Sequence, residues 1–357
     1  MRSLEKCVED IINSKNIAIF CHTAPDADTL ASAVALKKII KQNIDIETNP
    51  KQIDIFVDAE EIGDINQAII KGVNINQQTV EKYDLAISVD AASLSRLGKW
   101  QELFTSTINT INIDHHQSNT QFAKNNLVLK TSSTCEAIYM LSKIKNLTMS
   151  DNVLNLLYSG IITDTNNLTQ GVITVNTHKV IAEMMLRHIN IDALKTHFFQ
   201  NNPKSKAYLL QKALGSLRFL AYDRIAFMKI TKQDLQDAEA SFDDSVGIVN
   251  HGIDIKGVDI AILAIKQEDN SYYVSLRGKN GIDVSRIAKE FGGGGHDSMA
   301  AFQYNGLLTE LNPLLTKACK EELALHPREE LGENLFFGDD DEISNDKKEE
   351  NNSENDK

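Results

Sequence analysis

The stretch IAIFCHTAPDADTLASAVALKKIIKQ, residues 17–42, decides the class of fold. It begins with a short apolar run, passes through a polar loop, and ends with apolar residues at the spacing of an amphipathic helix. Three more β-rich runs follow, interleaved with helix-like stretches, at residues 53–60, 84–92 and 107–116. Strands that alternate with helices predict an α/β fold with a doubly wound, mainly parallel sheet.

Length and pattern together predict two domains. A chain of 357 residues is longer than one average domain, and each half can bury a core of its own. We expect the doubly wound domain to end near residue 200 and a smaller α+β domain to follow, with a cleft between them. The predicted division is a catalytic domain over 1–200, a helical linker over 201–217, a substrate-binding domain over 218–326 and a tail over 327–357.

The net charge is concentrated in this tail. The formal net charge of the chain is −13, and residues 329–357 contain twelve acidic and three basic side chains, which leaves −4 for the rest. A segment so charged and so poor in apolar residues is predicted to be disordered. The remaining chain lacks an extended basic face, so we expect no long duplex nucleic acid among its partners.

No feature of the sequence indicates a membrane or an oxidising compartment. No apolar run approaches the roughly 18 residues of a membrane span, and residues 1–16 read as an amphipathic helix instead of a secretory signal. The four cysteines form no C-x-x-C pair, which argues against a disulfide framework and a structural zinc site. We therefore predict a cytoplasmic protein without a membrane partner.

Charged side chains gather where the apolar runs end. They are His22, Asp26 and Asp28 after the first run, Asp90 after the third, Asp114, His115 and His116 after the fourth, and Asp164 at the end of a helical run. Taken singly, Asp28 could cap a helix that begins at Thr29, and Asp90 could be a turn residue. Loops that leave the carboxyl ends of parallel strands converge on one crevice, however, so these side chains should meet there.

Carboxylates at this density would repel one another by on the order of several kcal/mol unless cations lie among them. Carboxylate and imidazole ligands without thiolates suit Mn²⁺ or Mg²⁺. The number of ligands exceeds the need of one ion, and two ions bridged by a carboxylate are the arrangement that activates water for attack on a phosphoryl group. The sequence therefore predicts two divalent ions, Mn²⁺ being favoured and Mg²⁺ the alternative.

Five motifs resemble those of one family. HTAPDADTLAS (22–32), VDAAS (89–93), NIDHHQSN (112–119) and GIITDT (160–165) are similar to the four signature motifs of the DHH phosphoesterases, and GGGGHDSMAAF (292–302) is similar to that of the DHHA1 domain that often follows. The chain most resembles the branch that combines oligoribonuclease activity on very short RNAs with dephosphorylation of 3′-phosphoadenosine 5′-phosphate (pAp). Departures at Ala31, residues 166–171 and Gly278 bear on substrate preference.

The resemblance implies roles for the clustered residues. One ion would be held by His22, Asp26 and Asp90, and the other by Asp28, Asp90, His115 and Asp164, with Asp90 as the bridge. Asp114 would orient a neighbouring histidine, and His116 would face the scissile phosphate. In the second domain, Arg277, Gly293, Gly294, Gly295 and His296 would bind the non-scissile phosphate or terminal nucleotide, and Asn119 is a further candidate for a substrate contact.

The expected function is Mn²⁺-dependent hydrolysis of short RNA or DNA oligonucleotides to mononucleotides, and of pAp to AMP. Alternatives are a phosphodiesterase for cyclic di-AMP or linear pApA, a RecJ-like exonuclease for single-stranded DNA, an inorganic pyrophosphatase and a nucleotide-sensing module without turnover. No residues remain for the extra oligonucleotide-binding domain that RecJ-like proteins carry, and the glycine-rich motif argues against the pyrophosphatase. The oligomeric state is left open, a homodimer being one option.

Overall fold

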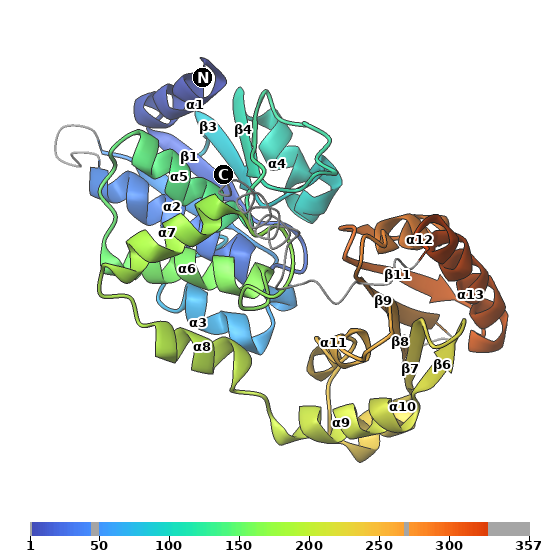
Figure 1. Cartoon of the computed structure of the whole chain (residues 1–357). Helices are drawn as coiled ribbons and strands as arrows, with labels where there is room; N and C mark the ends of the chain where they lie inside the picture. The colour runs from blue at the N-terminus through green and yellow to red at the C-terminus, as the bar shows by residue number, and fades with distance from the viewer. Residues whose placement is uncertain (1, 44–49, 268–270, 328–357) are drawn as a thin grey trace, which may run out of the picture.

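The computed structural model describes residues 2–43, 50–267 and 271–327, of which residues 2–5 are described by their backbone alone (Figure 1). All but the first residue of the tail predicted over 327–357 lies outside these ranges. The N-terminal amphipathic helix is present as α1 (Arg2–Asn13). In the described residues no helix is both long enough and apolar enough to span a membrane.

The first half of the chain builds a five-stranded sheet, sheet A. Its order is β2-β1-β3-β4-β5 and every neighbouring pair is parallel. The strands are β1 (Asn16–Phe20), β2 (Gln52–Phe56), β3 (Leu85–Val89), β4 (Asn109–Asp114) and β5 (Asn125–Val128). The predicted parallel α/β fold is confirmed. Strand β5 was not predicted, because its sequence NNLV has one buried residue and little β-rich character.

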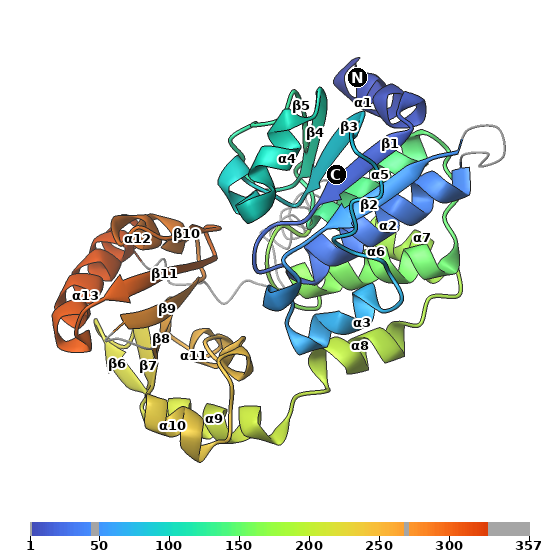
Figure 2. The same cartoon turned by 180° about the vertical axis from the view of Figure 1, so that it is seen from behind.

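Helices cover both faces of sheet A, as Figures 1 and 2 show from opposite sides. Ile17 and Ile19 of β1 point into the core shared with α2, α5 and α6, whereas Ala18 and Phe20 point to the opposite face, where Phe104 of α4 packs. The helices of this half are α2 (Ala27–Asn43), α3 (Gln67–Ile70), α4 (Gln101–Ser106), α5 (Thr134–Ile144), α6 (Asp151–Asp164), α7 (Val175–Met185) and α8 (Ile191–Phe199). Short 3₁₀ helices lie at η1 (Ala59–Glu61), η2 (Asp64–Asn66) and η3 (Leu94–Trp100).

The second half builds a mixed sheet of six strands, sheet B, after helix α9 (Lys204–Gly215). Its order is β10-β11-β9-β8-β7-β6, and only β7 and β8 pair in parallel. The strands are β6 (Arg218–Leu220), β7 (Ile225–Ile230), β8 (Ile260–Lys266), β9 (Ser271–Gly278), β10 (Gly294–Gly295) and β11 (Met299–Asn305). The α+β domain expected here is confirmed, whereas the boundaries at residues 200 and 217 stay predictions.

Sheet B packs between two helical layers. One core contains residues of α12 (Val284–Glu290) and α13 (Leu308–Leu325), and the other contains residues of α9 and α11 (Asn250–Ile253). Between β7 and β8 the chain forms α10 (Lys232–Asp237), η4 (Asp243–Ser245) and then α11. Residues 218–230 form the hairpin of β6 and β7, in which Ala221, Tyr222 and Asp223 adopt positive φ angles and turn the chain.

Candidate metal centre

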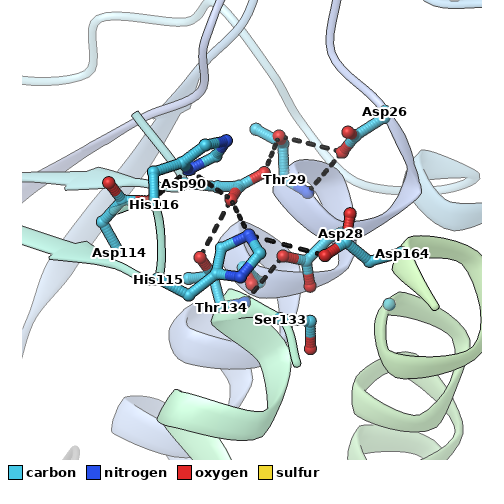
Figure 3. Close-up of polar contacts among 12 residues, drawn as sticks. Asp26, Asp28, Thr29, Asp90, Asp114, His115, His116, Ser133, Thr134 and Asp164 are labelled. Atoms are coloured by element: carbon cyan, nitrogen blue, oxygen red, sulfur yellow. Dashed lines mark hydrogen bonds and ion pairs between the residues drawn. The ribbon is translucent and has the colours of Figure 1, made fainter. Parts of the chain in front are cut away.

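The ends of β1, β3 and β4 bring the clustered side chains together at one edge of sheet A. His22 follows β1, Asp90 follows β3, and His115 follows β4. Figure 3 shows His115 beside Asp90 and Asp164. Asp164 arrives at the same place as the last residue of α6, which packs against α2. The convergence expected from a parallel sheet is thus what the structure contains.

Asp90 lies between two groups of these side chains. Its Oδ2 is 3.5 Å from Nε2 of His22, and its Oδ1 is 3.5 Å from Nε2 of His115. Asp90 has a φ of 60°, a conformation that few non-glycine residues adopt. The carboxylate, only 2% exposed, is thereby presented to both sides at once. Asp90 is the shared member of the candidate centre.

The groups on the two sides of Asp90 each have the composition of a metal site. Potential ligand atoms lie within 4.8 Å of one another in the sets His22–Asp26–Asp90, Asp28–His115–Asp164, Asp90–Asp114–His116 and His115–His116–His296. The first two sets contain all six predicted metal ligands. They consist of carboxylate and imidazole groups, a donor chemistry that suits hard or borderline divalent cations.

The orientation of the histidines also fits a metal. Nδ1 of His22 lies 2.7 Å from the Thr23 carbonyl oxygen, and Nδ1 of His115 lies 3.4 Å from the Thr131 carbonyl oxygen. Each Nδ1–H can donate to its carbonyl, and the Nε2 lone pair then points at carboxylate oxygens. The imidazole Nε2 and the carboxylate oxygen are then both acceptors, so a proton or a cation must lie between them. Metal-bound histidines whose Nδ1–H donates to a backbone carbonyl have the same arrangement.

Two threonines hold the shared carboxylate. Thr29 Oγ1 donates to Asp90 Oδ2 at 2.7 Å, and Thr134 Oγ1 donates to Asp90 Oδ1 at 2.9 Å. Thr29 also donates its backbone N–H to Asp26 Oδ1 at 2.9 Å. The capping role considered for Asp28 was therefore wrong, because α2 begins at Ala27 and Asp28 lies inside the helix. The carboxylate that accepts from the first turn of α2 is that of Asp26.

Asp28 is held by the start of α5 instead. The backbone N–H groups of Thr134 and Cys135 donate to its two carboxylate oxygens at 2.7 and 3.0 Å. On the other side, a Cβ on Gly160 of α6 would lie 2.5 Å from Asp28 Oδ1. Asp28 is thus fixed between two helices, and the glycine that opens the motif GIITDT is needed for its space.

The buried carboxylates influence one another's charge. Burial, together with the charges of Asp90 and Asp164, raises the pKa of Asp28 well above its usual value. Burial and the charge of Asp90 do the same to Asp164. Burial also disfavours the charged form of Asp90, but the neighbouring histidines outweigh it and hold its pKa below the ordinary value. The centre therefore has an excess of acidic groups for which a cation would be a partner.

His116 is held by the aspartate of the same motif. Nδ1 of His116 lies 2.7 Å from Asp114 Oδ1, which is fully buried beneath it. Burial opposes the charge of the imidazole, but the hydrogen bond to Asp114 and the charges of Asp90 and Asp114 raise the pKa of His116 to about 9. Asn119 donates to Asp114 Oδ2 at 2.5 Å and to the Ala91 carbonyl at 3.1 Å. These hydrogen bonds indicate that Asn119 holds Asp114 in place, which we favour over the substrate contact predicted for Asn119.

His296 of the second domain reaches this centre. Its ring stacks on that of His116, with 4.8 Å between centroids and 19° between planes, and lies 5.8 Å from the ring of His115. Burial and the nearby His116 and His115 lower the pKa of His296 to about 4. The two domains therefore meet at the candidate centre, with a neutral imidazole at neutral pH on the side of the second domain.

Arg277 lies on β9, whose neighbour β11 begins just after His296. It donates to Asn250 Oδ1 at 3.0 Å and to the Leu276 carbonyl at 2.9 Å. Within the part of the chain that the structure describes, these hydrogen bonds go to neutral acceptors, and burial lowers the pKa of the guanidinium to about 10. A partly buried cation without a carboxylate partner is suited to an anionic ligand.

The glycine run is a turn after α12 that continues into the short strand β10 (Gly294–Gly295), and is not a flexible link. A Cβ on Gly293 would lie 2.2 Å from the Ala301 carbonyl, and one on Gly295 would lie 2.3 Å from the Met299 carbonyl. Gly293 and Gly295 thus allow a close approach to β11, and the ligand contact predicted for the glycine run stays a prediction. Gly294 has open space around it. The turn fixes the position of His296, whose backbone N–H donates to Met299.

Sequence reasoning missed the segment TSSTCE, residues 131–136. Ser133 caps α5, and Thr134 and Cys135 bind the two aspartates described above. The buried Glu136 accepts hydrogen bonds from Ser132 and thereby holds this segment. The sequence Ser-x-x-Glu before an apolar run, which marks a helix start, was the available signal.

Arg96 of η3 was also missed. Its Nη2 lies 2.9 Å from Nδ1 of His22, and its carbonyl accepts a hydrogen bond from the Thr23 N–H at 2.8 Å. It follows the VDAAS motif by only a few residues, but an isolated arginine in a loop carries no distinctive pattern.

Comparison with known proteins agrees with the fold and the centre. The family model for the "DHH family, N-terminal domain" matches residues 16–161, and the model for the "DHHA1 domain" matches residues 223–324. The first match covers the parallel α/β domain that carries the carboxylate–imidazole centre, and the second covers the smaller α+β domain. The chain belongs to the DHH family of phosphoesterases, and the predicted family is confirmed.

Individual relatives cover most of the chain. It is 27% identical over 296 residues to the probable bifunctional oligoribonuclease and PAP phosphatase NrnA of Streptococcus mutans, covering 78% of this chain and 86% of that protein. It is 27% identical over 308 residues to the bifunctional oligoribonuclease and PAP phosphatase NrnA of Mycoplasma genitalium, covering 83% and 91%. The crystal structure of an exopolyphosphatase-related protein from Bacteroides fragilis shares the fold, with a TM-score of 0.76, 19% identity and coverage of 91% and 97%.

Proposed function

We propose that this chain hydrolyses short oligoribonucleotides to mononucleotides and pAp to AMP, using two divalent cations, with Mn²⁺ favoured over Mg²⁺. The observation that carries the proposal is the position of Asp90 between two potential ligand sets, His22 with Asp26 and Asp28 with His115 and Asp164. The names of the two bacterial relatives, whose alignments cover 78% and 83% of this chain, support the same substrates.

The residues of the two sets would hold the cations, with Asp90 shared between them. Bound ions would supply positive charge for the phosphoryl oxygens and a lower pKa for a water molecule. Thr29 and Thr134 fix the shared carboxylate, so that little reorganisation is needed during the reaction. Arg277 would bind the phosphate that is not cleaved.

His116 is proposed as the proton donor to the leaving oxygen. Its hydrogen bond to Asp114 keeps Nδ1 occupied and leaves Nε2 available on the opposite side of the ring. A pKa near 9 keeps the ring protonated at neutral pH. The stacked His296 limits the positions that His116 can adopt and lies where a substrate phosphate would reach the second domain.

Two other features of the proposal follow from the sequence. A cytoplasmic location fits the short nucleotides as substrates. The division into a catalytic domain, a linker and a substrate-binding domain agrees with a centre on sheet A that receives His296 from the second domain. We further propose that long duplex nucleic acid is not a substrate.

The test is a comparison of substrates with purified protein in Mn²⁺. We expect hydrolysis of a diribonucleotide and of pAp, and none of either in EDTA. A 24-mer of single-stranded DNA, cyclic di-AMP, linear pApA and pyrophosphate complete the set. Preference for cyclic di-AMP or pApA, or processive cleavage of the 24-mer, would replace the proposed substrates. The absence of turnover with every substrate would leave a nucleotide-sensing module.

A further inference from the structure

The face of sheet B that carries Arg277 also carries an aromatic side chain. Side chains alternate along a strand, so Tyr273, Ser275 and Arg277 of β9 share one face, while Val274 and Leu276 point into the core with α12 and α13. Arg277 Nη1 lies 3.4 Å from Ser275 Oγ, in agreement with this arrangement. Tyr273 therefore lies on the same face of β9 as Arg277, the proposed phosphate-binding residue.

Tyr273 pairs with a second exposed aromatic ring. Phe242, just before η4, meets it edge to face, with 5.2 Å between centroids and 88° between planes. The two residues are 36% and 38% exposed. Because the rings are perpendicular and remain partly exposed, they leave an aromatic face open to solvent, of the kind that stacking ligands use.

The aromatic pair lies between the two domains. The segment that carries Phe242 runs along β9, since Asn250, a few residues on, binds Arg277. Asp243, next to Phe242, is near the first domain, because a Cβ on Gly63 would lie 3.8 Å from its carboxylate. The pair therefore borders the region where His296 and Arg277 face the metal centre.

Two cations lie within electrostatic range of the tyrosine. Burial raises the pKa of the Tyr273 hydroxyl, while the positive charges of Arg277 and, from the first domain, Arg96 lower it. An aromatic surface beside arginines is the combination with which proteins bind single-stranded nucleic acid, the cations contacting phosphate and the rings stacking on bases. A surface for a protein partner would not need both an aromatic ring and an arginine.

We propose that Tyr273 and Phe242 form a stacking platform for a nucleobase of the substrate, in the nucleotide whose phosphate binds Arg277. The inference rests on the proposed function and names the part of the substrate that the second domain recognises. Because stacking uses the π-face that every base has, the platform would accept any base sequence. Asp243, whose carboxylate lies near Gly63 of the first domain, borders this side of the region.

The first experiment measures binding without catalysis. Isothermal titration calorimetry in EDTA compares AMP with ribose 5-phosphate, which has the same phosphate but no base. We expect Tyr273→Ala and Tyr273→Leu to weaken AMP binding about tenfold and to leave ribose 5-phosphate binding within about twofold. Tyr273→Phe should bind AMP like the wild type, because it keeps the ring.

Tyr222→Ala is the matched control. Tyr222 is 99% exposed in the turn between β6 and β7, so its removal should change neither affinity. The leucine variant keeps most of the side-chain volume, and thermal unfolding of each variant identifies any that do not fold. An equal loss for both ligands in the folded leucine variant, or no loss of AMP binding, would overturn the platform.

The second experiment uses steady-state kinetics on a diribonucleotide in Mn²⁺. We expect Phe242→Ala to raise KM several-fold with kcat changed less than about twofold, as for the loss of uniform substrate binding. A loss confined to kcat would contradict the platform. If the wild type hydrolyses no nucleotide but the calorimetry still depends on the base, the proposed function fails and the platform stands.

Discussion

The imidazole rings of His116 and His296 stack at 4.8 Å although they belong to different domains. His116 is anchored in the first domain by Asp114, and His296 is anchored in the second by the glycine turn against β11. The candidate centre is therefore completed only when the two domains meet. In the proposed function, the first domain would contribute the chemistry and the second the recognition of the substrate.

Substitution of the two histidines should separate these contributions. His116→Gln is expected to lower kcat for a diribonucleotide by about 100-fold, because a proton donor is lost. His296→Ala should chiefly raise KM, because its ring would contact substrate in the second domain. Steady-state kinetics in Mn²⁺ measures both. An unchanged kcat in the first variant, or an unchanged KM in the second, would contradict the respective role.

Asp90→Asn should lower the rate of hydrolysis by at least about 10³-fold, because it removes the negative charge shared by both ligand sets. The fold should be kept. Elemental analysis of dialysed protein should find fewer Mn²⁺ ions per chain than in the wild type. Asp58→Asn is the control: Asp58 also follows a strand of sheet A but pairs with Lys99 on the surface, so turnover should stay normal. Wild-type turnover by the Asp90 variant would refute the proposed centre.

Thr134→Val should lower kcat/KM about tenfold without removing it, because Asp90 loses one of its two hydroxyl donors and an acceptor is left unsatisfied. Thr134→Ser restores the hydroxyl and should restore most of the activity. Thr105→Val, on the exposed side of α4, should leave kinetics unchanged. If serine fails to rescue while valine is impaired, packing of the methyl group is responsible instead of the hydrogen bond.

Gly160→Ala should reduce both stability and Mn²⁺ affinity. The new Cβ would meet Cys135 Sγ at 2.4 Å and Asp28 Oδ1 at 2.5 Å, so that Asp28 must move, at a cost of about 1–3 kcal/mol in unfolding free energy. Gly215→Ala, at the end of α9 with open space around it, is the matched control and should be neutral or slightly stabilising. Chemical denaturation and Mn²⁺ titration test the pair. Equal effects of the two substitutions would contradict the tight packing at Gly160.

The stability of the metal-free protein should depend on pH through Asp28. Its pKa is raised in the folded state by burial and by Asp90 and Asp164, whereas the unfolded chain has the ordinary value near 4. Its contribution to the unfolding free energy is therefore fully present below about pH 4 and is lost as the pH rises through the folded pKa.

The measurement is thermal unfolding in EDTA from pH 5 to pH 8. Asp28→Asn cannot ionise, so its midpoint should fall less than that of the wild type over this range. Added Mn²⁺ should raise the midpoint of the wild type more at pH 8 than at pH 5, since protons compete with the metal for the same carboxylates. Parallel pH profiles for wild type and variant in EDTA would show that Asp28 does not titrate in this way.

Much of the fold could be predicted because apolar periodicity is a local property. The runs that became β1, β2, β3 and β4 are continuous and largely buried, and their alternation with helices identifies the parallel sheet. Strand β5 and the hairpin turn at Tyr222 escaped, because one has little apolar character and the other depends on left-handed backbone in residues that seldom adopt it.

The sequence alone determined which side chains would meet at the edge of sheet A, since a parallel sheet brings its strand ends together and the motif residues follow those ends. It could not determine what holds them. The donors to Asp28 and Asp90 come from the start of α5, and the rings of His296 and Tyr273 come from a second sheet. Contacts of this kind join residues far apart along the chain. Only tertiary packing decides them, because no local pattern of residues records which distant hydroxyl, backbone N–H or ring will lie beside a given carboxylate or imidazole.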